Sequence, residues 1–148
     1  MKKYDFEELG NVNSFQDQII NEAMKEKQAK KSKVWTSLLE TYIRQREIIL
    51  NAPVPDSNED AEEDVLPPSI KLLKRNINQK YANQLYRWGM RADKVGNFRI
   101  IYVIYDYHKV LFLHAFDKQY NGDIKREDIE EAEKIYEDYL KKYPSKYL

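Results

Sequence analysis

The sequence has no cysteine, so it can form no disulfide, no thiolate metal site and no cysteine nucleophile. Long apolar runs are also missing: the longest, such as residues 100–105, are far too short to cross a bilayer, and no apolar leader segment begins the chain. The four glycines form no phosphate-binding loop. We therefore expect a soluble protein of the reducing cytoplasm, with no membrane partner and no small-molecule cofactor.

Histidine is scarce as well. The two histidines, His108 and His114, show no recognisable order of metal ligands with the nearby Asp106 and Asp117. We therefore expect no metal site.

A net charge of zero hides an uneven distribution of charge along the chain. Residues 56–64 concentrate acidic side chains, whereas eight basic residues between Lys71 and Arg99 face a single acid, Asp93. Such a basic segment suits a polyanionic partner. An ordinary solvated surface would carry the same composition.

The chain length fits one domain, residues 1–148, with one core. An exposed acidic loop is expected over residues 51–68, where four of the five prolines lie. The other expected elements are an edge strand over residues 2–9, a helix capped by Ser14, a second helix with an apolar stripe from Val34 to Ile49, a short basic helix or turn over 69–77, a strand over 83–91 and a closing helix over 126–143. No glycine or proline enforces a break near Ser32, so one long helix is the alternative to a helical hairpin.

The segment "GNFRIIYVIYDYHKVLFLHAFDKQ" (96–119) predicts two strands joined by a turn at residues 106–109. A turn that pairs Asp106 with Lys109 places Arg99 opposite Phe116. Because side chains alternate between faces, Arg99, His114 and Lys118 then share one face of the sheet. A four-residue loop gives the same result, whereas a three-residue loop would put them on opposite faces.

The other face of this pair of strands is expected to be apolar. It would carry Phe98, Ile100, Tyr102, Ile104, Leu111, Leu113 and Ala115. Helices must cover such a surface. The expected fold class is α+β: a small antiparallel sheet with an N-terminal helical hairpin and a C-terminal helix packed on one face, and a basic groove on the other.

The order and spacing of several of these segments resemble one family. The run "NFRIIYVIYDYHKVLFLHAFDKQ", followed by "IKREDIEEAEKIYEDYL", is similar to the RelE/ParE toxin superfamily of type II toxin–antitoxin systems, in its phage-derived, HigB-like branch. The similarity extends from about Arg87 to Leu140, and the fold it implies is RelE-like. One departure is Gln119, because the family commonly has a second lysine after the position of Lys118.

This resemblance implies an endoribonuclease that cuts mRNA, often on the ribosome, and is held inactive by a cognate antitoxin. Such enzymes need no metal, because the 2′-hydroxyl of the RNA attacks the adjacent phosphate. The implied catalytic residues are Arg99, which would hold the phosphate, Lys118, which would neutralise developing charge, His114, which would be available to titrate near neutral pH, and Arg91, at the family's basic position on the preceding strand. Lys71, Lys74, Arg75, Arg87 and Lys94 are the expected RNA-binding residues.

Two alternatives stay open at this point. His114 is either a catalyst or a packing residue of a half-buried strand. The protein itself is either the nuclease or a non-catalytic binding module, such as the ParE-like toxins that block DNA gyrase.

Overall fold

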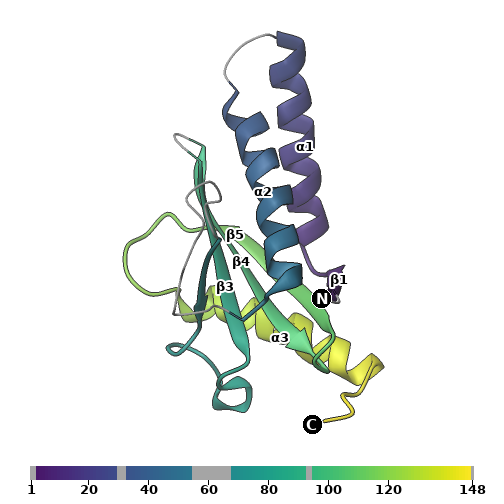
Figure 1. The fold of residues 1–148 in the computed structure, drawn as a ribbon. Helices are drawn as coiled ribbons and strands as arrows, with labels where there is room; N and C mark the ends of the chain where they lie inside the picture. The colour runs from purple at the N-terminus through teal and green to yellow at the C-terminus, as the bar shows by residue number, and fades with distance from the viewer. Residues whose placement is uncertain (1–2, 30–32, 55–67, 93–94, 148) are drawn as a thin grey trace.

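The structure is a computed structural model that describes residues 3–29, 33–54, 68–92 and 95–147. Its centre is a five-stranded sheet in the order β1-β5-β4-β3-β2 (Figure 1). The strands are β1 (Asp5–Glu8), β2 (Ser69–Leu72), β3 (Leu85–Ala92), β4 (Gly96–Tyr105) and β5 (Lys109–Asp117). The helices are α1 (Val12–Ala29), α2 (Val34–Asn51), the 3₁₀ turn η1 (Gln79–Tyr81) and α3 (Arg126–Lys142). The α+β class, the helical hairpin and the closing helix are confirmed. Most of the expected acidic loop and Lys94 lie outside the described residues.

The helical hairpin consists of α1 and α2, with the break where it was expected. α1 begins at Val12, two residues before the expected cap Ser14. The carboxylate of Glu26 in α1 accepts hydrogen bonds from the backbone N–H groups of Trp35 (3.0 Å) and Thr36 (2.8 Å). These groups belong to the first turn of α2, which has no partner for them within the helix. A side chain from α1 therefore caps the start of α2 where the sequence has no glycine or proline.

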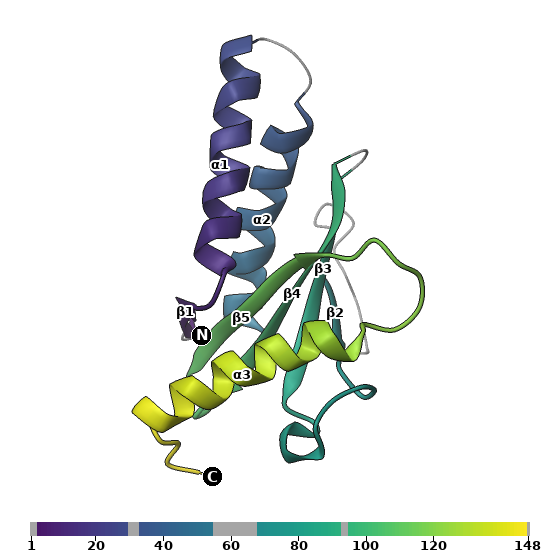
Figure 2. The same ribbon diagram turned by 180° about the vertical axis from the view of Figure 1, so that it is seen from behind.

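The helical hairpin and α3 cover opposite faces of the sheet (Figures 1 and 2). The buried residues of α1 and α2 pack with Trp88, Ile100 and Phe112, whereas those of α3 pack with Ile101 and Leu113. The expectation that all helices share one face was wrong. Both faces of the central strands are apolar over most of their length, so each needs its own helical layer.

The turn between β4 and β5 explains this difference. It has three residues, because Tyr105 pairs with Lys109, and Asp106 and Tyr107 adopt positive φ angles of 49° and 63°. Near the turn, the register therefore differs by one residue from the expected one, and Leu111 and Leu113 face α3 instead of the helical hairpin. A one-residue shift moves every side chain of a strand to its other face.

A β-bulge then restores the expected register. Between Ile101 and Tyr102 the pairing shifts by one residue, so that Ile101 pairs with His114 and Arg99 pairs with Phe116. The pairing that the sequence predicted for Arg99 is confirmed, although the loop has the length that seemed to forbid it.

The two outer strands were partly anticipated. The predicted edge strand is β1, but it pairs parallel to β5, so the sheet is mixed. Residues 69–77 were expected to form a short helix or turn. They begin instead with β2, which pairs antiparallel with β3. Pairing with β3 overrides the weak helical preference of this basic stretch.

The chain leaves β1 through a tight turn at Gly10. Its φ of +54° suits glycine, and a Cβ atom there would lie 2.5 Å from the carbonyl oxygen of Leu113. The next residue, Asn11, extends the pairing with β5. Its side chain donates to the oxygen of Ala115 (2.6 Å) and accepts from the same residue's N–H (2.8 Å).

A polar cluster joins β1 to the helical hairpin. Arg46 Nη1 lies 2.6 Å from Glu8 Oε1 and 2.9 Å from Gln16 Oε1, and the hydroxyl of Tyr42 donates to Glu8 (3.1 Å). Only 8% of the Glu8 side chain and 17% of the Arg46 side chain are exposed. This ion pair accounts for the polar residue at position 46 in the apolar stripe of α2.

Within the described ranges, none of the helices has the length and apolar character that a membrane span requires.

Candidate functional site

Basic side chains gather on the α3 face of the sheet, beyond the apolar cluster that α3 covers. Arg87 and Arg91 lie two residues to either side of Gly89 on β3, and Gly89 pairs with Arg99 on β4. Because alternate residues of a strand share a face, the three arginines project from the same side of the sheet.

Lys118 joins this group from the end of β5. Its backbone N–H donates to the oxygen of Asn97 (2.7 Å), which continues the ladder beyond the last strand pair. Arg99 and Phe116 are paired, and Lys118 lies two residues after Phe116. The predicted meeting of Arg99 with Lys118 on one face is therefore present in the structure.

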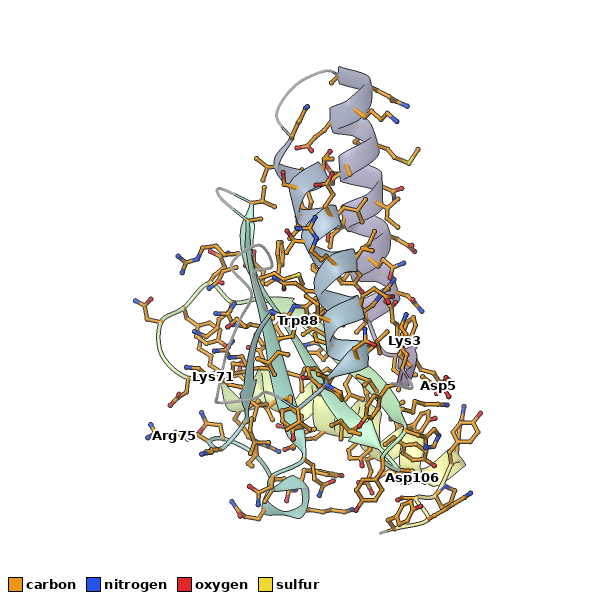
Figure 3. The ribbon with its side chains drawn as sticks, in the orientation of Figure 1. Lys3, Asp5, Lys71, Arg75, Trp88 and Asp106 are labelled. Atoms are coloured by element: carbon orange, nitrogen blue, oxygen red, sulfur yellow. The ribbon has the colours of Figure 1, made fainter. Side chains whose placement is uncertain are left out.

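A cavity of about 280 Å³ opens between these strands and the loop before α3. We call it the cationic cavity. Its lining residues are Lys71, Leu72, Leu73, Lys74, Arg75, Arg87, Arg99, Lys118, Gly122, Asp123 and Ile124. Figure 3 shows Lys71 and Arg75 on the side of the sheet away from the helical hairpin. Four of the five predicted RNA-binding residues thus line one cavity with two of the predicted catalytic residues.

The cations of this site repel one another. Burial lowers the pKa of Arg99, and the charge of Arg91 lowers it further. The pKa of Arg87 is lowered by burial and by Arg99, and that of Lys118 by burial, Arg99 and Arg87. Like charges that are half withdrawn from water destabilise one another, so a bound anion would stabilise the group.

Neutral groups hold these side chains in place. Arg99 Nη1 donates to Asn97 Oδ1 (2.7 Å) and to the oxygen of Phe98 (3.0 Å). Arg87 Nη1 donates to the hydroxyl of Ser69 (3.1 Å). An arginine has five N–H donors, so most of them stay available to a ligand. In the described part of the chain, no carboxylate lies within ion-pair distance of either arginine.

Lys118 is oriented by Tyr120. Its Nζ donates to the oxygen of Tyr120 (3.1 Å) and lies 5.0 Å from the centre of the ring, while Lys125 Nζ lies 4.5 Å from the same ring. The Tyr120 hydroxyl donates to Asp128 (2.6 Å), and its pKa is raised by burial and by this carboxylate. Tyr120 is therefore protonated at neutral pH and positions the ammonium group of Lys118.

His114 lies apart from the cationic cavity. Its ring stacks on Phe116 with 5.5 Å between the ring centres, and it does not line the cavity. Burial lowers the pKa of His114, although Asp128 and Glu131 of α3 act in the opposite direction. Arg91 is exposed, shares the face of Arg99 and also lies outside the lining.

Three residues of the site were not predicted. Asp123 is an acidic side chain of the cavity lining, and its carboxylate lies 3.2 Å from Arg75. Asn97 holds Arg99, and Gly89 lies beneath the arginines. A glycine between two arginines at alternate positions of a strand was the available signal, because strand glycines mark places of close approach.

Comparison with known families adds one finding. Residues 65–137 match the family described as "Phage derived protein Gp49-like (DUF891)". This segment, just under half of the chain, includes β2–β5 and the whole lining of the cationic cavity. No curated protein and no solved structure matches the chain significantly.

The lowered pKa of His114 predicts a pH-dependent stability. Between this lowered value and the ordinary value of 6.5, the unfolded chain binds more protons than the folded chain. Stability should therefore fall as the pH falls below 6.5. We expect His114→Gln to flatten the dependence of Tm on pH between 7.5 and 5, measured by circular dichroism. An unchanged slope in His114→Gln would contradict the assignment of this pH dependence to His114.

Proposed function

We propose that this chain is the toxin of a toxin–antitoxin pair, and that it is a metal-independent endoribonuclease of the RelE/ParE superfamily that cleaves mRNA. The observation that carries the proposal is the cationic cavity, where half-buried cations converge without carboxylate partners at Arg87, Arg99 or Lys118 in the described residues. The RelE/ParE resemblance and the phage-derived family match support it, because they fall on the same strands.

The proposed reaction is a transesterification. The RNA 2′-oxygen attacks the adjacent phosphorus, the bond from phosphorus to the 5′-oxygen breaks, and the products are a 2′,3′-cyclic phosphate and a 5′-hydroxyl. Arg99 would bind the non-bridging oxygens, whose charge grows in the transition state. Arg91 would add to the positive potential at the rim.

Two proton transfers complete the reaction. Lys118 would donate a proton to the leaving 5′-oxygen, since burial and the neighbouring arginines lower its pKa and so make it a stronger acid. Asp123 would accept the proton of the 2′-hydroxyl, because a carboxylate is the proton acceptor that the cavity lining offers. We give His114 a packing role, and cleavage by His114→Gln should stay within a few-fold of wild type.

The test is cleavage of a defined mRNA by the purified protein, with and without a translating extract and in the presence of a metal chelator. We expect fragments that end in a 2′,3′-cyclic phosphate. Absence of cleavage under all conditions would reject the nuclease. If DNA supercoiling by gyrase is blocked in the same experiment, the ParE-like alternative replaces it.

A cognate antitoxin is the expected partner. A nuclease of this kind would damage the cell that makes it, so a protein that binds it and masks the cationic cavity is required. Co-expression of the neighbouring reading frame should relieve growth arrest caused by the toxin.

A further inference from the structure

Gly89 occupies the position where the two central arginines of the cationic cavity meet. It pairs with Arg99 on β4 and with Ser69 on β2, and Arg87 lies two residues before it on the same face. A residue with a side chain at this position would project between both arginines.

The guanidinium groups already fill the space that a side chain would need. A Cβ atom on Gly89 would lie 3.0 Å from Arg99 Nη1, 3.1 Å from Arg87 Nη1 and 3.2 Å from Arg99 Cζ. Both Nη1 atoms are about 3 Å from one point, so they are at most about 6 Å apart. Charge-assisted hydrogen bonds from guanidinium to phosphate oxygen are about 2.8 Å long, so one phosphate group can accept hydrogen bonds from both arginines across this gap.

The contacts of Arg87 and Arg99 within the fold do not explain why the two side chains lie so close together. Each carries a positive charge, their hydrogen bonds go to a hydroxyl, an amide and a backbone carbonyl, and no described carboxylate pairs with them. Two half-buried cations side by side cost stability unless an anion compensates them. A bare glycine beneath them makes this unfavourable approach possible.

We propose that Arg87 and Arg99 form a two-guanidinium clamp for a single phosphate group, and that Gly89 is the positioning residue that lets the clamp close. The inference deepens the proposed function and rests on it, because the phosphate would be the scissile phosphate of the RNA. Arg87, which the sequence predicted only as an RNA-binding residue, would then bind the same phosphate group as Arg99.

Gly89→Ala is the direct test, with inorganic phosphate as the probe and titration calorimetry as the measurement. We expect phosphate to bind at least tenfold more weakly to the variant than to wild type. The Cβ atom meets the flexible ends of two arginines rather than backbone, so the arginines should move apart while the strand keeps its conformation. Tm should stay equal or rise, because alanine loses less backbone entropy than glycine on folding.

The control is Lys134→Ala, at an exposed position of α3 outside the cationic cavity. Its phosphate affinity should stay within twofold of wild type. Arg87→Ala supplies a second variant. If Gly89 acts through the arginines, adding Gly89→Ala to Arg87→Ala should weaken phosphate binding far less than it does in wild type.

A spectroscopic readout separates positioning from general damage. Phosphate should shift the side-chain N–H resonances of both Arg87 and Arg99 in wild type, and neither in Gly89→Ala. Wild-type phosphate affinity in Gly89→Ala, or a shift confined to one arginine in wild type, would overturn the clamp. If wild type shows both resonance shifts but cuts no RNA, the clamp is kept and the proposed nuclease is rejected. If wild type cuts RNA but Gly89→Ala binds phosphate with undiminished affinity, the clamp alone is rejected.

Discussion

Arg99→Ala should lower the rate of RNA cleavage by about 10²- to 10³-fold, the usual effect of removing one donor that stabilises the negative charge of a transition state. Arg99 is suited to this role because it pairs with Phe116 at the centre of the basic face and is held by Asn97 and the oxygen of Phe98. The variant should be folded and at least as stable as wild type. Loss of the Arg99 charge relieves the repulsion that lowers the pKa of Arg87 and Lys118.

The control for lost charge is Lys134→Ala, at an exposed position of α3 outside the cationic cavity. It should cleave RNA at the wild-type rate. Arg99→Lys keeps the charge but loses the planar two-pronged donor, so it should recover only part of the activity. If Arg99→Ala cuts RNA as fast as wild type does, the catalytic assignment of the cavity is wrong.

Glu8→Ala should cost about 3–5 kcal/mol of unfolding free energy, the range measured when one partner of a buried ion pair is removed. The substitution leaves the guanidinium of Arg46 buried against Phe6 and Tyr42 without its carboxylate, and Arg46 Nε already has no hydrogen-bond partner among the residues that the structure describes. Chemical denaturation followed by circular dichroism measures the loss.

The same two regions of the chain supply an exposed ion pair as the control. Lys3, just before β1, pairs with Glu47 of α2, and both side chains are nearly half exposed. Glu47→Ala should cost less than about 1 kcal/mol. The double variant Glu8→Ala with Arg46→Met should be more stable than Glu8→Ala alone, since it removes the unpaired charge. Equal costs for Glu8→Ala and Glu47→Ala would contradict the importance of burial.

Alternation and helical periodicity predicted a large part of the molecule. The apolar stripes gave the two helices of the hairpin and α3, and the strand-forming runs on either side of residues 106–109 gave β4 and β5. The pairing of Arg99 with Phe116 followed from counting along these strands, and so did the shared face of Arg99 and Lys118. These features depend on local patterns, which one sequence displays directly.

The features that were missed depend on contacts between distant residues or on cancelling irregularities. The three-residue turn and the β-bulge each shift the register by one, and their combination leaves no trace in the alternation around Arg99. Leu111 and Leu113 consequently change face, which decides where α3 packs. β2 is a strand because β3 pairs with it, and Asp123 enters the cavity from a loop whose path no periodicity describes.

The parallel pairing of β1 with β5 bears on the order of events during synthesis. Asn11 and Ala115, which share two hydrogen bonds, are 104 residues apart in the chain. β1 is synthesised first but can pair only after β5 has been synthesised, and closing so long a loop is entropically costly. The cavity likewise needs Asp123 from the final quarter of the chain. The proposed site can therefore form only after β5 and the loop that follows it have been synthesised.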